Sequence, residues 1–181
     1  VDPFTDGAAT AVSITAGYGS HTCALLNTGT VNCWGANTSG QLGDGTTTAS
    51  PVPVAVDPFT DGAATAVSIT AGNRHTCALL NTGTVNCWGY NWAGQLGDGT
   101  TADRSVPVAV GAFTDGAATA VSITAGYYHT CALLNTGTVN CWGYNSYGQL
   151  GDNSLTNSSV PVAVDPFTDG AATAVSITAG Y

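Results

Sequence analysis

The sequence predicts an all-β protein made of propeller-type blades, each with four short antiparallel strands. Three observations favour this fold class. The chain of 181 residues contains 24 glycines but no methionine, lysine or glutamate, so strong helix formers are scarce. One segment recurs along the whole chain. Within each copy, apolar and polar residues alternate with the period of two that is typical of strands.

The repeat defines the organisation of the chain. Three full copies cover residues 1–55, 56–109 and 110–163, and a partial fourth copy covers residues 164–181. The partial copy is identical in sequence to residues 1–18. We therefore expect one continuous array of three repeats plus the first strand of a fourth, either open or completed by oligomerisation.

Each repeat is expected to contain four strands, which the first repeat illustrates in order. Alternating valine, serine, isoleucine and threonine predict a strand over residues 11–16, with the valine and isoleucine on one face. The next two strands, over residues 22–26 and 30–34, flank a three-residue loop in which Gly29 suits a hairpin bulge. Prolines in residues 51–56 predict an edge strand, where a missing N–H donor is tolerated.

A second motif recurs along these strands and the loops that follow them. Its three copies are His21-Thr22, Cys33-Trp34-Gly35, Asn37 and Gly40-Gln41-Leu42-Gly43; His75, Trp88-Gly89, Asn91 and Gly94-Gln95-Leu96-Gly97; and His129, Trp142-Gly143, Asn145 and Gly148-Gln149-Leu150-Gly151. In this motif and the proline-containing strand that follows, the chain resembles the repeat of the regulator of chromosome condensation family. The resemblance implies a β-propeller, usually of seven blades, so this chain departs from the family in its number of repeats.

The resemblance also bears on function. The founding member of the family is a nuclear exchange factor that binds a small GTPase and chromatin, but no residues here match an exchange element. A secreted bacterial relative, β-lactamase inhibitor protein II, uses the same propeller as a protein-binding surface. The resemblance thus favours a binding protein over an exchange factor.

Charge excludes several classes of partner. The formal net charge is −9, and Arg74 and Arg104 are the two basic residues of the chain. Binding to nucleic acid requires clustered Lys and Arg, so no nucleic-acid partner is expected. No apolar run approaches the roughly 20 residues of a membrane helix, so no membrane insertion is expected either.

The cysteines form three equally spaced pairs. These are Cys23 and Cys33, Cys77 and Cys87, and Cys131 and Cys141. If Leu26 and Thr30 flank the hairpin loop, then Cys23 faces Cys33 at a non-hydrogen-bonded position, where side chains approach most closely. We therefore expect three disulfides, each worth roughly 2.5–3 kcal/mol on the chain-entropy estimate. The alternative is six unpaired thiols buried in the core.

Disulfides persist in oxidising compartments, so the pairs indicate an extracellular or cell-surface protein. The histidines and tryptophans of the motif recur at fixed repeat positions, which favours structural roles in and between blades over catalysis. In the recurring FTDGAA segment, Asp6, Asp61, Asp115 and Asp169 each precede glycine, a pairing typical of turns. A calcium site is the alternative, but Gly111 replaces an aspartate in the third repeat. No catalytic residue, metal or cofactor is expected.

The repeats differ mainly in two loops, between the first and second strands and between the third and fourth. In an antiparallel blade these loops lie on the same face. Several of the variable residues are aromatic or arginine, which are enriched at binding hot spots. The candidate partner-binding residues are Tyr18, Asn73, Arg74, Trp92, Tyr127, Tyr128 and Tyr147. The alternative is drift in loops without a function, and three copies do not decide between the two.

Three blades are too few to close a propeller. The leading functional prediction is therefore a non-enzymatic extracellular structural or adhesive protein. It would self-associate through blade-to-blade contacts and through the spare strand of the fourth copy, into a ring or a fibre. The alternative is a soluble secreted binding module or inhibitor, which uses the variable loop face to bind a protein or a cell-surface ligand.

Overall fold

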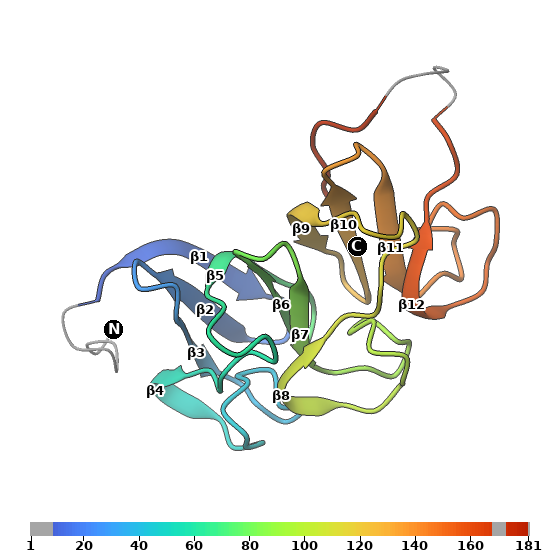
Figure 1. Ribbon diagram of the computed structural model, residues 1–181. Coiled ribbons are helices and arrows are strands. Elements are labelled where there is room, and N and C mark those ends of the chain that lie inside the picture. The colour runs from blue at the N-terminus through green and yellow to red at the C-terminus, as the bar shows by residue number, and fades with distance from the viewer. Residues whose placement is uncertain (1–8, 168–172, 181) are drawn as a thin grey trace.

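The computed structural model describes residues 9–167 and 173–180, which form three four-stranded antiparallel sheets arranged in an arc (Figure 1). Blade 1 consists of β1 (Ala11–Gly17), β2 (His21–Leu26), β3 (Val31–Gly35) and β4 (Ser50–Ala55). Blade 2 consists of β5 (Ala66–Ala71), β6 (His75–Leu80), β7 (Val85–Gly89) and β8 (Arg104–Ala109). Blade 3 consists of β9 (Ala120–Ala125), β10 (His129–Leu134), β11 (Val139–Gly143) and β12 (Ser158–Ala163).

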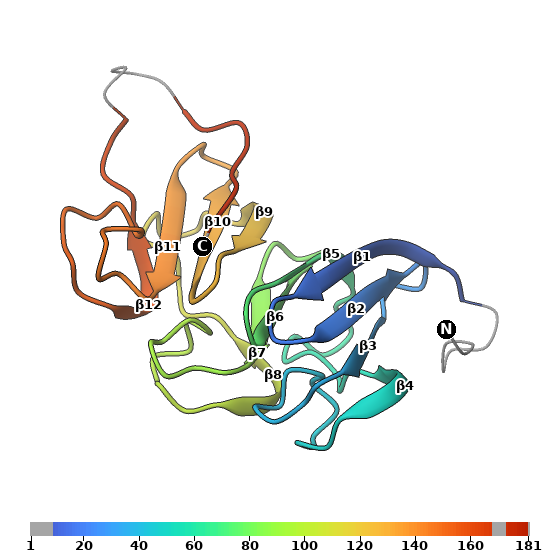
Figure 2. The same ribbon diagram turned by 180° about the vertical axis from the view of Figure 1, so that it is seen from behind.

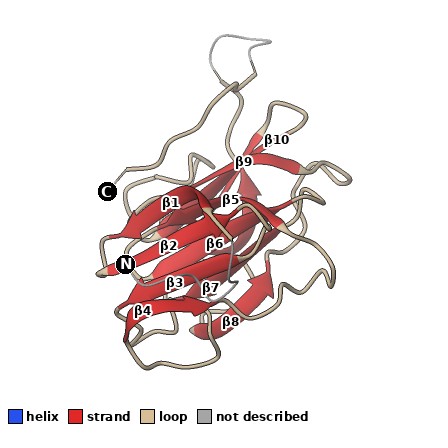
Figure 3. Ribbon diagram, turned by 90° about the vertical axis from the view of Figure 1, so that its left-hand side faces the viewer, coloured by secondary structure: helices blue, strands red, loops and turns tan. Residues whose placement is uncertain are grey.

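The predicted fold class is confirmed. Each sheet lies within one repeat, and its strands follow one another in chain order. The first strands β1, β5 and β9 are neighbours on the inner side of the arc, and β4, β8 and β12 form its outer edge (Figures 1 and 2). The described residues contain strands and loops but no helix, and therefore no helix long and apolar enough to cross a membrane (Figure 3). The sheets do not close into a ring.

The hairpin between β2 and β3 has the predicted geometry. The Leu26 N–H donates to the Thr30 carbonyl oxygen at 2.9 Å, and Gly29 has a φ of 81°, which other residues rarely adopt. This register places Cys23 opposite Cys33, with Cα atoms 4.1 Å apart, and the two sulfurs are bonded. Equivalent disulfides join the hairpins of the other two blades. All three disulfides therefore cross-link the two strands of a hairpin within one blade.

The first strand of each blade departs from simple alternation. In β5 the register shifts between Ala66 and Ser68, which marks a β-bulge. Val67 is consequently 54% exposed, whereas Ile69 is 8% exposed in the core between blades 1 and 2. The prediction that valine and isoleucine share one face is wrong, because the extra residue in the bulge changes the side to which the valine points.

A repeated set of hydrogen bonds joins neighbouring blades. The buried Trp88 of blade 2 donates from Nε1 to the Gln41 carbonyl oxygen of blade 1 at 3.0 Å. The Thr76 hydroxyl donates to the same oxygen at 3.1 Å. Since that hydroxyl has one proton, it accepts its 2.9 Å hydrogen bond from Nε2 of His21. Blades 2 and 3 make the same contacts through Gln95, Trp142, Thr130 and His75. The interpretation of these histidines and tryptophans as structural is thus correct.

In its described residues, the partial fourth copy forms no strand, although its sequence predicts one, because no described hairpin lies beside it for it to pair with. It nevertheless contacts blade 3. The Ala174 N–H donates to the Gly137 carbonyl oxygen at 3.0 Å, and the Ala179 N–H donates to Thr124 Oγ1 at 3.2 Å. Strands β5 and β9 make the equivalent bonds to the blades that precede them. The predicted turns at Asp6 and Asp169 lie outside the described residues.

Glycine is required where a histidine ring of one blade approaches the next blade. A Cβ atom on Gly72 would lie 2.1 Å from Cε1 of His75 and 2.5 Å from the Gly126 carbonyl oxygen. Neither neighbour can move easily, because one is a buried ring and the other is backbone of the adjacent blade. We expect Gly72→Ala to lower the free energy of unfolding by about 1–3 kcal/mol in denaturant titrations.

Gly180 provides the matched control for this substitution. It occupies the same place in the repeat as Gly72, but no heavy atom lies within 4 Å of its Cβ position. Gly180→Ala should therefore leave stability nearly unchanged. Equal stability losses in the two variants would contradict the close-approach explanation.

Candidate functional site

One end of the three blades carries a continuous group of aromatic side chains, which we call the aromatic face. Its members are Tyr18, Tyr90, Trp92, Tyr127, Tyr128, Tyr144 and Tyr147. They come from the loop between the first two strands of a blade and from the start of the loop between the last two. The ring contacts confirm that these loops share a face, as an antiparallel blade requires.

Tyr128 lies at the centre of the aromatic face. Its ring centroid is 4.5–6.3 Å from four other ring centroids, those of Tyr90, Trp92, Tyr127 and Tyr144. Its hydroxyl accepts a 3.2 Å hydrogen bond from Nδ2 of Asn73 in blade 2. Tyr18 of blade 1 joins the group through Tyr127, at 5.7 Å between centroids. All three blades therefore contribute to a single surface.

The long loop that carries Trp92 is held by the neighbouring asparagine. The Nδ2 group of Asn91 donates to the Asp98 carboxylate at 3.2 Å and to the backbone carbonyl oxygens of Thr100 and Ala102 at 3.2 and 3.0 Å. Its Oδ1 accepts from the Leu96 N–H at 3.0 Å. Asn37 and Asn145 make equivalent bonds in the other blades. These buried amides give the variable loops a fixed conformation.

The side chains predicted to bind a partner differ in their exposure. Tyr147, Tyr18 and Trp92 are 87%, 63% and 45% exposed, and Arg74 is also exposed. Tyr127 and Tyr128 are half-buried. Asn73, by contrast, is only 6% exposed. Its side chain is turned inward and supports Tyr128, so the structure assigns it a positioning role, and its direct contact with a partner stays a prediction.

Two members of the aromatic face, Tyr90 and Tyr144, were not among the residues predicted from the sequence. They follow the Cys-Trp-Gly segment of the motif, at a position where the first repeat has Ala36. This position differs between the repeats, and that difference is the sequence signal that indicates these two tyrosines. Their rings lie 6.2 and 6.3 Å from that of Tyr128.

The two arginines have different environments. Arg104 forms an ion pair with Asp98, at 2.9 Å between Nη2 and Oδ2. Partial burial opposes ionisation of Asp98, but hydrogen bonds from Thr100 and Arg104 outweigh it and lower the pKa of the carboxyl group. Arg74 extends from the turn before β6 at the border of the aromatic face.

The opposite face consists of turns. Gly62 has a φ of 68°, and the carboxylate of the preceding Asp61 accepts hydrogen bonds from Thr82 and Thr84 on the hairpin loop. The turn interpretation of this Asp-Gly pair is correct. Among the residues that the structure describes, no group of three or more His, Cys, Asp or Glu side chains is placed to hold a metal ion.

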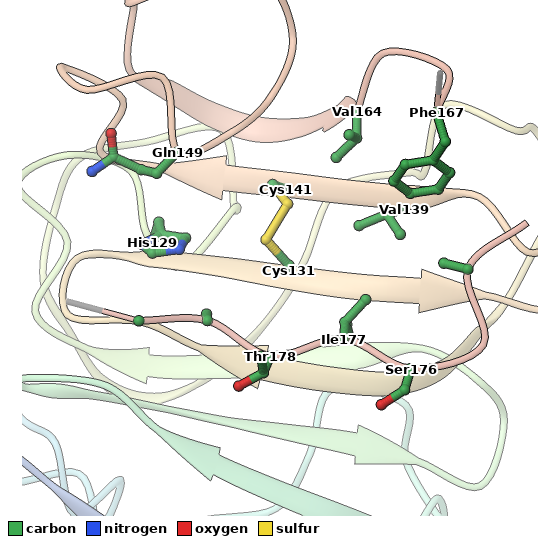
Figure 4. Close-up of a pocket in the computed structure, with 13 residues that line it drawn as sticks. His129, Cys131, Val139, Cys141, Gln149, Val164, Phe167, Ser176, Ile177 and Thr178 are labelled. Atoms are coloured by element: carbon green, nitrogen blue, oxygen red, sulfur yellow. A yellow bond between two sulfur atoms is a disulfide. The ribbon is translucent and has the colours of Figure 1, made fainter. Parts of the chain in front are cut away.

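A cavity of about 470 Å³ lies on the face of the blade 3 sheet that is turned away from blade 2 (Figure 4). The Cys131–Cys141 disulfide and Val139 line its floor, with His129 and Gln149 at one end and Phe167 at the other. Ile177 and Ala174 of the partial fourth copy pack against this floor. The equivalent space beside blade 1 is filled by blade 2, and the equivalent space beside blade 2 is filled by blade 3.

The motif histidines are neutral at physiological pH. Burial lowers the pKa of His21 to about 4. For His75, burial and then repulsion from His21 and His129 lower the pKa to about 3. Burial also lowers the pKa of His129. A proton on any of these rings would lose its hydration without a compensating acid, so acidification opposes folding.

Four-stranded antiparallel blades packed side by side in an arc, with their variable loops on one face, define a β-propeller repeat protein. A model of the regulator of chromosome condensation (RCC1) repeat matches residues 28–79, 82–133 and 136–181. A second model of the same repeat matches residues 11–41, 66–95 and 120–149. The chain belongs to the RCC1 repeat family.

Curated relatives share the repeat in longer chains. The chain is 34% identical over 142 residues to the ultraviolet-B receptor UVR8 of Arabidopsis thaliana, which covers 78% of this chain and 31% of the receptor. It is 39% identical over 156 residues to the probable E3 ubiquitin-protein ligase HERC4 of Homo sapiens, covering 83% of this chain and 14% of the ligase. The chain thus spans about a third or less of these relatives.

Solved structures have the same fold. Human WBSCR16 matches 98% of this chain and 44% of its own length, with a TM-score of 0.82 and 24% identity. Prp20p of Saccharomyces cerevisiae matches 94% of this chain and 42% of its own length, with a TM-score of 0.81 and 18% identity. At these identities the likeness establishes the architecture of the blades.

The depressed histidine pKa values predict loss of stability in acid. An unfolded histidine titrates near pH 6.5, whereas His75 stays neutral in the fold down to about pH 3. Because the unfolded chain then binds more protons, the free energy of unfolding should fall as the pH decreases from about 6.5 to 3. Denaturant titrations across this range test the expectation.

A His75→Gln variant isolates the contribution of this histidine. Titration of the aspartates is common to both proteins and cancels in the comparison. The variant should lose less stability than the parent between pH 6.5 and 3. Parallel stability curves for the two proteins would show that the buried ring does not control the acid response.

Proposed function

We propose that this chain is a non-enzymatic protein-binding module and that the aromatic face is its binding surface. The observation that carries the proposal is the single network of ring contacts that runs from Tyr18 in blade 1 to Tyr147 in blade 3. Tyrosine and tryptophan bury large areas at a small cost in side-chain entropy, and they are enriched at binding hot spots. A surface with three strongly exposed rings, set on fixed loops, suits a protein partner.

Relatives support the class of function, but not a particular partner. The yeast protein Prp20p binds Gsp1p and histones, and a further crystal structure contains Kap60 bound to it. In these two structures the yeast chain is 18% and 21% identical to this one. We therefore take from them that blades of this kind bind proteins, and we place the surface from the side chains of this chain.

Truncation of the exposed rings tests the proposal. In Trp92→Ser/Tyr147→Ser, two hot-spot side chains are removed from exposed positions, so the fold should persist. Affinity capture with the parent chain, followed by mass spectrometry, should yield partners that this variant loses. For any partner that still binds the variant, the affinity should be at least about tenfold lower than for the parent chain, since a hot spot contributes roughly 2 kcal/mol or more.

Phe167→Ser is the matched control. Phe167 is 42% exposed, close to the value for Trp92, but it follows β12 at the opposite end of the blade. This variant should capture the same partners as the parent chain. If Trp92→Ser/Tyr147→Ser also captured them with unchanged affinity, the aromatic face would not be the binding surface.

We infer a second candidate function from the surface of blade 1, an exported structural or adhesive protein that assembles blade against blade. Ile14 is 68% exposed, whereas Ile69 and Ile123, its counterparts, are 8% exposed because a preceding blade covers them. An apolar surface of this kind favours contact with a further blade of the same type, in a second copy or a longer array. The three disulfides support export to an oxidising compartment.

Solution mass and electron microscopy of the oxidised chain test this assembly. The mass should rise with protein concentration, and rings or fibres should be visible, because each added contact buries the Ile14 surface. Ile14→Asp should remain monomeric, while Val52→Asp, at an exposed site on the outer strand, should assemble normally. A concentration-independent monomer, or free thiols in protein isolated from its native source, would contradict the proposal.

A further inference from the structure

The aromatic face contains a hollow of about 280 Å³ within blade 3, next to the larger cavity of Figure 4, with which it shares His129 and Gln149. Its lining consists of Tyr127, Tyr128, His129, Tyr144, Tyr147 and Gln149. The first three residues belong to the turn between β9 and β10 and the start of β10, and the others follow β11. Four tyrosine rings thus form most of its wall.

The rings stand nearly perpendicular to one another. The interplanar angle is 84° between Tyr127 and Tyr128, 79° between Tyr128 and Tyr144, and 71° between Tyr144 and Tyr147. Rings at such angles meet edge to face, so each contact combines the edge of one ring with the face of the other. The face of an aromatic ring carries negative electrostatic potential and attracts a cation within about 6 Å of the centroid.

The polarity of the lining narrows the choice of ligand. The accessible surface of the hollow is almost entirely apolar. A sugar or a primary ammonium would need several convergent hydrogen-bonding groups to replace its water. A trimethylammonium group has no N–H to satisfy, and it spreads its charge over apolar methyl groups. It therefore matches a wall of aromatic carbon.

Charge favours the same ligand. The chain has a formal net charge of −9. Within the lining, His129 is the one residue that could become positive, and burial lowers its pKa, so it stays neutral at physiological pH. Arg104 is paired with Asp98 in blade 2, and Arg74, at the border of the aromatic face, is not among the residues that line the hollow. The field of the chain thus attracts a small cation, and no lining side chain repels it.

We propose that this hollow binds a trimethylammonium group through the faces of Tyr128, Tyr144 and Tyr147. The inference rests on the proposed binding role of the aromatic face and names a ligand chemistry for it. Trimethyl-lysine on a partner protein and free choline both present this group. The two sources share the same chemistry, and the experiment separates them.

The test is a titration of the whole chain with choline and, separately, with N-acetyl trimethyl-lysine amide. Binding is measured from the shifts of the tyrosine ring signals in NMR spectra. The decisive control ligand is 3,3-dimethylbutanol, which has the shape of choline without its charge. Both cations should bind at least about tenfold more tightly than the neutral analogue. The tighter of the two cations identifies the source. Equal affinity for choline and its neutral analogue, or no binding of either cation, would overturn the proposal.

Substitutions locate the site. Tyr144→Leu should weaken choline binding by about tenfold, whereas Tyr144→Phe, which keeps the ring, should retain it. If Tyr144→Leu does not fold, Tyr147→Leu serves instead, because Tyr147 is 87% exposed and its loss leaves the core intact. Phe167→Leu, at the opposite end of the blade and outside the aromatic face, should bind choline normally. Equal weakening by Phe167→Leu and Tyr147→Leu would rule out this hollow as the site.

The protein-binding surface and the ammonium site can be rejected independently of each other. Loss of captured protein partners in Trp92→Ser/Tyr147→Ser, together with no cation binding, would retain the binding surface and reject the ammonium site. Cation binding with the expected preference, together with unchanged partner capture in that variant, would retain the site and reject the protein-binding surface.

Discussion

The arrangement of the blades depends on one buried acceptor at each interface, a backbone carbonyl oxygen that receives two donors from the next blade. At the first interface the Gln41 oxygen accepts from the Trp88 indole and from the Thr76 hydroxyl. A buried carbonyl left without donors would cost free energy, so each blade is satisfied only with its neighbour in place. The indole also fills the apolar space between the sheets, which couples hydrogen bonding to core packing. Neighbouring blades therefore adopt one relative orientation.

This fixed orientation determines where the aromatic face lies. Tyr128 comes from blade 3, its supporting Asn73 comes from blade 2, and Tyr18 reaches the group from blade 1. Small rotations between blades would separate these rings. The loops are equally constrained, because buried amides such as Asn91 satisfy their carbonyl groups. Variable residues are thus presented by an invariant frame, which allows the surface to change while the core stays the same from repeat to repeat.

Much of the fold follows from local sequence, whereas the finer details of the site depend on contacts between blades. The three-residue loop ending in Gly29 determines the hairpin register, and the register determines the partner of Cys23. The bulge that exposes Val67 has no comparable local signal, and simple alternation misplaces it. The inward orientation of Asn73 depends on Tyr128, which is distant in sequence. Likewise, the last AVSITA segment has strand-forming residues but no described partner to pair with.

The placement of the disulfides inside the hairpins has a mechanical consequence. Under tension applied at its ends, the array can lose the contacts between blades and then its sheets, but the segment between Cys23 and Cys33 stays closed. Each disulfide spans ten positions along the chain, so it withholds roughly 30–35 Å of extension in its blade. The non-covalent contacts between blades break first, and the disulfide-closed hairpins limit the final length of the extended chain. Oxidation therefore sets the extensibility of the chain as well as its stability.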